Sequence, residues 1–296
     1  PFALLILCRL FIAAPAPTPA HAAAAPAPER PAEVKSDLIV FGGTPAELLE
    51  AHSRDQLIEF ATGVWATGED WLVLGGGSNI VAADDLSELT VIRTLNRGID
   101  RDGTRLRVQA GENWDEFVSF TVDAGLTGVE ALSGIPGSVG AAPVQNIGAY
   151  GQEVSETITR LEFVEYPSGD IRVLENSELG FGYRDSIFKR GCQGVITWVE
   201  FELSEGSPAR LDRLTQAIGR EVSTPAEIRR EVLATRAAKG MVLDANDRDT
   251  FSCGSFFTNP IVSEGFSLGI PSEAPRWLQE DGSVKLSAAW LIENSG

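Results

Sequence analysis

The chemically informative residues of this chain are two uncharged, glycine-rich stretches, GGGSN at 75–79 and LSGIPGSVGAAPVQNIGAYG at 132–151. Glycine has no Cβ and adopts positive φ readily, so backbone N–H groups in such loops can approach phosphate oxygens closely. Neither a dinucleotide fingerprint nor a P-loop is present, because Ile80 stands where the former needs glycine and no Gly-Lys-Ser/Thr follows. A tight turn explains GGGSN alone equally well. Two such loops in one domain favour a large, flat, partly anionic ligand whose ring lies against bare backbone.

Single charged and hydroxyl side chains form a second group of candidates. Arg184, in GYRDS, has a planar guanidinium that suits a carboxylate ligand, although an ion pair with Asp185 is the commoner fate of an arginine in an acidic protein. Arg236 and Lys239 share one helix face, where cations near a helix C-terminus are also favourable without any ligand. Ser255, in GSFF, needs nearby positive charge to act as an acid, and from the residues alone a hydroxyl that caps a turn is the better interpretation.

Composition excludes several classes of function. The net charge of −18 argues against nucleic acid and anionic membranes as partners, because both require a basic face. The cysteines, Cys8, Cys192 and Cys253, are odd in number and have no metal-ligand spacing, which favours a reducing compartment. The histidines, His21 and His52, lie near no motif, so we expect neither a Ser-His triad nor a bound metal.

Mixed helices and strands are predicted around these stretches. Strand 71–74 runs directly into GGGSN, and the pattern alternates again at 105–110. Capping signals predict a helix from Ser53 to Gly63, one from Asn113 to just before Gly125, one from Thr224 to about Lys239, and a last one over 287–294. Further strands are predicted at 158–166, 170–174 and 195–203, and a linker at 205–208. This order favours an α+β fold over a regular βαβ array.

The first 34 residues differ in composition from the rest of the chain. An apolar run, FALLILCRLFIAA, precedes an Ala/Pro-rich stretch in which AHA resembles a signal cleavage site. Arg9 interrupts the apolar run instead of preceding it, so we interpret 1–34 as a disordered leader, with export as the alternative. We expect no membrane insertion, because no later segment is long and apolar enough.

Five segments, in order, resemble the signature of the UDP-N-acetylenolpyruvoylglucosamine reductases: VLGGGSNIV, LSGIPGSVGAAPVQNIGAYGQE, FGYRDSIFK, GSFFTNPIV and DGSVKLSAAWLIE. The resemblance covers about 41–296. It implies an FAD-binding fold of the vanillyl-alcohol-oxidase-like (PCMH) type at 35–205, in two lobes of about 35–100 and 101–205. A smaller α/β substrate-binding domain is implied at 206–296, incomplete at its C-terminus.

The activity that the resemblance implies is reduction of UDP-N-acetylglucosamine enolpyruvate to UDP-N-acetylmuramate, in cytoplasmic peptidoglycan precursor synthesis. Non-covalent FAD is the implied cofactor and NADPH the co-substrate, with no nucleic-acid partner and a monomeric chain. Arg184 is then the group that binds the substrate carboxylate, and Ser255 is the proton donor. The implied substrate-binding residues are Tyr183, Arg236, Lys239 and Asn259. The implied FAD-binding residues are Gly75, Gly76, Gly77, Ser78, Asn79, Ser133, Gly134, Ile135, Pro136, Gly137, Ser138, Gly140, Ala141, Asn146, Gly148 and Ala149.

Two departures from the family pattern qualify this expectation. Leu211 stands where one branch of the family clamps the UDP with a tyrosine, and leucine offers no hydrogen bond to phosphate. Family chains also continue past LSAAWLIENSG into a segment with a catalytic glutamate, a role that Glu293 does not take. We therefore expect this chain to oxidise NADPH better with substitute acceptors than with the enolpyruvyl substrate. Two alternatives remain: an oxidase on the same fold, disfavoured because neither glycine loop contains histidine, and a catalytically silent FAD-binding protein.

Overall fold

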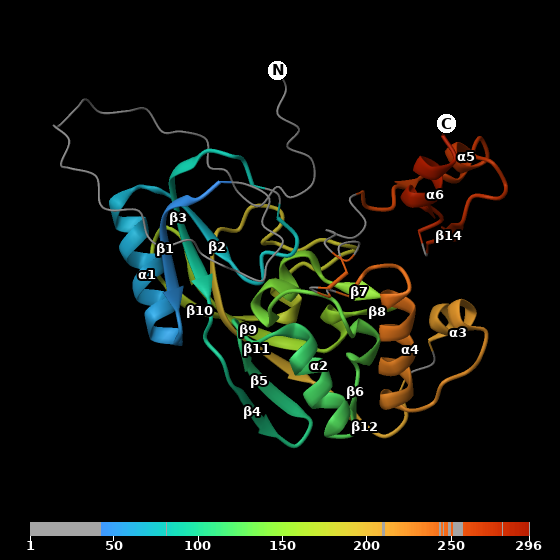
Figure 1. Cartoon of the computed structure of the whole chain (residues 1–296), viewed down its shortest axis with the longest axis horizontal. Helices are drawn as coiled ribbons and strands as arrows, with labels where there is room; N and C mark the ends of the chain where they lie inside the picture. Colours follow the sequence, from blue (N-terminus) through green and yellow to red (C-terminus); the bar gives the residue numbers. More distant parts are fainter. Residues whose placement is uncertain are drawn as a thin grey trace. The chain divides into compact units, whose positions relative to one another are not determined.

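A computed structural model of the chain describes two compact units, drawn in Figure 1 and treated separately below. The first lies within residues 43–250 and the second within 257–295. The described residues are 43–80, 82–208, 211–242, 244, 246–247, 250, 257–279 and 281–295. The predicted leader at 1–34 lies outside them.

The first unit begins with a small parallel sheet that delivers the first glycine loop. Its strands β1 (Pro45–Ala51), β3 (Leu86–Thr94) and β2 (Asp70–Leu74) pair in the order β1-β3-β2. The strand predicted at 71–74 is confirmed as β2, and it ends directly before Gly75. Helix α1 (Arg54–Thr67) connects β1 to β2 and packs beside β1 and β3 (Figure 1).

Helix α1 starts as predicted but ends later. The Ser53 hydroxyl accepts a hydrogen bond from the Gln56 N–H at 3.2 Å, which confirms the N-cap. The predicted end at Gly63 is wrong, because the helix continues to Thr67 and closes at Gly68, whose φ is +76°. Glycine inside a helix costs only about 1 kcal/mol, and burial of Val64 and Trp65 beyond it outweighs that cost.

A five-stranded antiparallel sheet forms the body of the first unit. Its strand order is β10-β9-β11-β5-β4. Helix α2 (Trp114–Asp123) contributes Trp114 and Phe117 to the main core, where the rings of Phe117 and Phe201 lie 4.8 Å apart. The Asn113 cap is confirmed, and so are four predicted strands, with the bounds β5 (Arg105–Gln109), β9 (Ile158–Glu165), β10 (Ile171–Glu175) and β11 (Gly194–Glu202). The fifth strand, β4 (Ile99–Asp102), was not predicted.

Helix α1 also holds the two sheets together. Its Leu57 shares a buried cluster with Val164 of β9 and Val195 of β11. At its first turn, Arg54 donates two hydrogen bonds to Glu162 of β9, at 2.6 and 3.0 Å. The position of the small sheet, and so of the loop after β2, is therefore set by apolar burial and by one bidentate ion pair.

The second glycine loop and two further helices complete the first unit. Helix α4 (Pro225–Ala237) packs against α2 and against the 3-10 helix η1 (Glu130–Leu132) at the start of the loop (Figure 1). The predicted Thr224 cap is confirmed, since its hydroxyl accepts from the Glu227 N–H at 3.2 Å. The remaining elements are β6 (Leu126–Thr127), η2 (Val139–Gln145), β7 (Gly148–Ala149), β8 (Gln152–Glu153), η3 (Val154–Glu156), η4 (Asn176–Glu178), β12 (Ser204–Glu205) and α3 (Asp212–Ile218).

The second unit is a small antiparallel sheet with two short helices. Its strands pair in the order β13-β15-β14, and the helix predicted over 287–294 is present, with the Ser287 hydroxyl as its N-cap, accepting from the Trp290 N–H. The elements are β13 (Ile261–Val262), α5 (Glu264–Ser267), β14 (Arg276–Leu278), β15 (Val284–Leu286) and α6 (Ala288–Glu293). No helix in the described part of the chain is both long and apolar enough to cross a bilayer.

We predict that Glu162→Gln lowers the free energy of unfolding at pH 7 by about 2 kcal/mol. Burial acts to raise the pKa of Glu162, but hydrogen bonds from Arg54 and Thr197 outweigh it and hold the pKa below its usual range. A lowered pKa adds stability above the unfolded value, about 4.3, and that stability is lost as the pH falls through the folded value. Urea unfolding should therefore show a difference between wild type and variant that is full at pH 7 and shrinks below pH about 4.

Glu116→Gln is the control, because the Glu116 side chain is 71% exposed in its pair with Arg97 and should contribute little. An equal effect of the two substitutions would contradict the role given to Glu162.

Candidate cofactor and substrate site

The two glycine loops meet backbone to backbone. A Cβ added at Gly76 would lie 2.7 Å from the Cα of Gly137, a separation that real Cβ atoms do not show. A Cβ at Gly75 would instead meet small side chains of the second loop, the hydroxyl of Ser138 and, at 3.4 Å, the Cβ of Ala141. The structure thus brings together two stretches that the sequence separates by about sixty residues, and it does so because neither carries a side chain at the contact.

The second loop is anchored on its other side to the start of α2 and the end of β5. The Val139 N–H donates to the carbonyl of Glu112 at 2.9 Å, and the Gly140 N–H donates to Ala110 at 2.8 Å. A Cβ at Gly140 would lie 2.6 Å from the Cβ of Ala110, so this glycine is also required by packing. The loop is therefore a rigid platform, held by its own backbone.

Polar groups without protein partners remain where the loops meet. The hydroxyl of Ser138 is buried and has no hydrogen-bond partner. Within the described residues, the N–H groups of Gly76, Gly77 and Ser78 donate to no protein acceptor. Gly77 and the Ser138 hydroxyl are buried, whereas Gly76 and Ser78 are half-buried. An unpaired donor that is buried is costly in a folded protein, and phosphate oxygens would satisfy it. These groups fit a diphosphate-containing cofactor such as FAD.

Asn146 connects the end of the second loop to the turn that carries Arg184. Its side-chain oxygen accepts from the Ser155 N–H at 3.1 Å, and its nitrogen donates to Glu153 at 2.8 Å and to the Gly182 carbonyl at 3.0 Å. These bonds hold it in a left-handed conformation, with φ of +46°. The side chain of Asn146, a predicted FAD-binding residue, is therefore hydrogen-bonded within the protein. Its direct effect is to fix the position of the turn that carries Arg184.

Arg184 lies at the edge of the loop without a carboxylate partner. Its guanidinium donates to the carbonyls of Asn146, at 3.2 Å, and of Gly148, and it lies over the ring of Tyr183 at 5.2 Å. The alternative ion pair with Asp185 is not formed, because Asp185 pairs with Arg190. Among the described residues, Arg184 makes no ion pair, so its charge is available to an anionic ligand.

Arg236 reaches the second loop from α4. It is half-buried beside Gly134, its Nε has no partner, and its other bond is to the Met241 carbonyl at 3.1 Å. Burial lowers the pKa of Arg236, opposed by the charges of Tyr150 and Asp115. Lys239 lies beyond the end of α4 and is exposed, so the two cations do not share an environment as their spacing suggested.

Tyr150 lies close to Arg236, and the sequence reasoning did not single it out. It is half-buried with a φ of +53°, and burial raises the pKa of its hydroxyl, while the nearby charge of Arg236 acts in the opposite direction. The available signal was its place between the last two glycines of the second loop, where a large side chain stands among small ones.

The other predicted residues are distributed differently. Ser255, the predicted proton donor, lies outside the described residues. Asn259 belongs to the second unit, where its side-chain oxygen accepts from the Ala288 N–H at the start of α6, at 3.0 Å. Leu211 lies in a buried cluster with Leu214, Ile228 and Val232, which is a packing reason for leucine at this position. The described residues hold no group of three or more histidine, cysteine, aspartate or glutamate side chains placed to bind a metal ion.

Known proteins share this arrangement. Residues 45–175, which include both loops, match the family described as FAD binding domain, FAD_binding_4. The chain is 49% identical to the UDP-N-acetylenolpyruvoylglucosamine reductase of Leifsonia xyli subsp. xyli, over 86% of this chain and 79% of that protein. It is 44% identical to the enzyme of that name from Mycolicibacterium gilvum, over 86% and 75% of the two chains.

A solved structure agrees with these matches. The crystal structure of UDP-N-acetylenolpyruvylglucosamine reductase from Thermus caldophilus is similar with a TM-score of 0.50 and 26% identity, over 81% of this chain and 80% of that one. The α+β class and the FAD-binding fold of the PCMH type, which the sequence predicted, are confirmed.

We predict that Gly76→Ala weakens FAD binding about tenfold, because overpacking of this kind costs about 1–3 kcal/mol and must push the two loops apart. Flavin fluorescence titration of the flavin-free chain measures the dissociation constant. Gly63→Ala is the matched control, since nothing lies within 4 Å of its added Cβ inside α1. It should leave FAD binding unchanged and raise stability by about 0.5–1 kcal/mol. Unchanged affinity in Gly76→Ala would show that the loop contact does not shape the FAD site.

Proposed function

The chain belongs to the UDP-N-acetylenolpyruvoylglucosamine reductases, and on that premise we propose that it reduces UDP-N-acetylglucosamine enolpyruvate to UDP-N-acetylmuramate with NADPH. The product is a peptidoglycan precursor, so the protein serves cell-wall biogenesis, and with it cell shape and division, as a cytoplasmic monomer. The observation that carries the proposal is Arg184, an arginine that has no carboxylate partner within the described ranges and lies at the edge of two bare loops that fit FAD.

The loops provide the FAD site in this proposal. The N–H groups of Gly76, Gly77 and Ser78 and the hydroxyl of Ser138 are the donors that would hold the diphosphate. When bound, FAD supplies the carrier that takes a hydride from NADPH and passes it to the enolpyruvyl double bond. The glycines keep side chains out of the space that the ring needs, and at Gly137 the Ser78 hydroxyl lies 3.7 Å from the position of the missing Cβ.

Arg184 is the residue that we propose binds the substrate carboxylate. Addition of hydride to the double bond places negative charge on the carbon next to that carboxylate, and a fixed cation there lowers the barrier. The guanidinium is suited to this because its planar fork pairs with both carboxylate oxygens. Its position is set in advance by two backbone carbonyls of the second loop, so little reorganisation is needed when the substrate arrives.

The UDP moiety needs further cations in a chain of net charge −18. We propose that Arg236, with its unpaired Nε, and the exposed Lys239 supply them near the second loop, and that Tyr183 lines the pocket beside Arg184. We propose that Asn259 contacts the substrate through its amide nitrogen, because its side-chain oxygen already accepts a hydrogen bond at the start of α6. Ser255 stays the predicted proton donor to the substrate carbon.

We predict that the purified chain is yellow, and that acid precipitation releases its flavin into the supernatant. NADPH consumption should rise when UDP-N-acetylglucosamine enolpyruvate is added under anaerobic conditions, because the substrate is then the only electron acceptor. Absorbance of the supernatant and of NADPH records both results. Flavin that stays in the pellet, or consumption that requires oxygen and ignores the substrate, would instead support an oxidase.

We also predict that Arg184→Lys keeps bleaching of the flavin by NADPH but slows its reoxidation by the enolpyruvyl substrate by about tenfold or more. Lysine keeps the charge and loses the bidentate fork. Rapid-mixing absorbance measures the two steps separately. Arg190→Lys is the control, because Arg190 pairs with the neighbouring Asp185 and has no predicted role in ligand binding. Equal slowing of both steps would show that Arg184 is structural.

A further inference from the structure

Helix α4 is attached to the second glycine loop through Asp115 of α2. Arg229 donates two hydrogen bonds to this carboxylate, at 2.6 and 2.9 Å. The same carboxylate accepts the N–H of Gly134 at 2.6 Å. One aspartate therefore joins three segments that are far apart in sequence: the first turn of α2, the glycine loop and the middle of α4.

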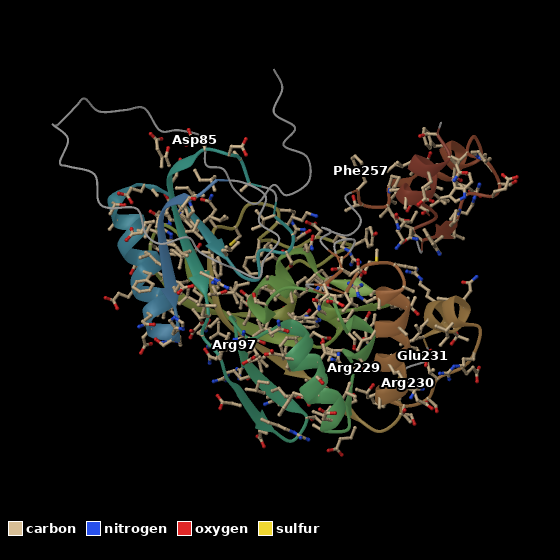
Figure 2. All side chains as sticks on the ribbon, in the orientation of Figure 1. Asp85, Arg97, Arg229, Arg230, Glu231 and Phe257 are labelled. Carbon is tan, nitrogen blue, oxygen red and sulfur yellow. The ribbon has the colours of Figure 1, made fainter. Side chains whose placement is uncertain are left out.

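The next residue along α4 is engaged quite differently. The Arg229 side chain is 16% exposed in its pair, whereas that of Arg230 is 63% exposed and pairs with Glu231 of the same helix. Figure 2 shows Arg229 on the side of α4 that faces α2, with Glu231 on the side toward α3. Exposed pairs of the second kind contribute little, whereas a bidentate, mostly covered pair holds two elements in register.

Gly134 is held from two sides by this arrangement. Its N–H is bound by Asp115, and the space at its missing Cβ is closed by Leu233 and Arg236, whose atoms would lie 2.9 and 3.3 Å from an added Cβ. Arg229 and Arg236 are seven residues apart, two helical turns along the same face of α4. The ion pair at Arg229 thus determines where Arg236 meets the loop.

We propose that Asp115 and Arg229 form a positioning pair, which fixes α4 against Gly134 and thereby places Arg236 for the substrate. The pair touches no predicted reacting atom and acts through Arg236 and through the loop. The inference rests on the proposed function, because it takes the ligand of Arg236 to be the UDP-sugar substrate.

The ionisation of Asp115 is consistent with this role. Burial acts to raise the pKa of Asp115, but the bonds from Arg229 and Gly134 and the charge of Arg236 outweigh it, so the pKa lies below its usual range. The carboxylate is therefore charged, and the pair intact, at every pH above the ordinary aspartate value of about 3.9.

The first test follows Gly134 in the flavin-free chain, by amide hydrogen exchange. Asp115→Ala should speed exchange of the Gly134 N–H about tenfold, since it removes a bond to a charged acceptor. Arg229→Gln should speed it severalfold, because α4 no longer covers the glycine, while the neighbouring Arg230→Gln should leave it unchanged. Unaltered exchange in both Asp115→Ala and Arg229→Gln would overturn the proposal.

The second test is a double-mutant cycle on substrate affinity in the FAD-loaded chain, read from the change in flavin absorbance. Arg229→Gln should weaken binding of UDP-N-acetylglucosamine enolpyruvate about tenfold, and Arg229→Lys by less. In an Arg236→Gln background, Arg229→Gln should add no more than about twofold, because its effect passes through Arg236. Fully additive effects would mean that Arg229 is merely structural, and would overturn the positioning role.

The two tests separate this inference from the proposed function. A wild-type chain that binds FAD but not the UDP-sugar would refute the proposed substrate. The attachment of α4 to the loop would then be decided by the exchange of Gly134 alone, supported if Arg229→Gln speeds it and overturned if it does not.

Discussion

The close approach of Gly76 to Gly137 is the constraint on which the rest of the first unit depends. Two backbones lie so near that a single added Cβ would be 2.7 Å from the opposite chain. The small parallel sheet must therefore hold the loop after β2 at a defined distance from the five-stranded sheet. That distance is fixed by the buried face of helix α1, which packs against both sheets, and by the bidentate pair of Arg54 with Glu162. A change in the packing of α1 is thus transmitted to the cofactor site.

The placement of cations follows from the strongly acidic composition. Arg54 of α1 and Arg160 of β9 are paired with the carboxylates of Glu162 and Glu200 and act as structural links. Arg184 and Arg236 differ, because the bonds they make are to backbone carbonyls around the second loop. Carbonyls orient a guanidinium without neutralising its charge. These two guanidinium groups therefore keep local positive charge around the second loop, within a chain of net charge −18.

Helix α4 belongs physically with the cofactor-binding part of the chain. It packs on α2 and η1, and Asp115 joins it to the loop. The boundary between FAD-binding and substrate-binding domains that we expected near residue 205 stays a prediction. The two compact units of the structure are divided elsewhere, between residues 250 and 257 of the described chain. Arg236 of α4, which the family resemblance assigns to the substrate, thus lies in the same compact unit as the residues assigned to FAD, while the buried side chains of α4, Ile228 and Val232, form a cluster separate from the main core.

The sequence alone determined the features that depend on local chemistry. Caps at Ser53, Asn113 and Thr224 start helices because their side chains satisfy free N–H groups nearby, and the ordered motifs identify the family and its fold. Among the strands that escaped prediction, β1 has the sequence PAELLEA, which has little strand propensity, and it is extended where it pairs with β3.

Only the tertiary structure decided how distant segments meet. It carried α1 past Gly63, since the buried apolar contacts beyond that residue outweigh a local cost of about 1 kcal/mol. Tertiary packing pairs Asp185 with Arg190, so Arg184 has no carboxylate partner among the residues that the structure describes. It also places Leu211 in a buried cluster and Tyr150 near Arg236. None of these contacts could be predicted from the sequence pattern, because each depends on how the surrounding chain is packed. For the same reason, no pattern within either glycine loop could have shown that the two loops touch.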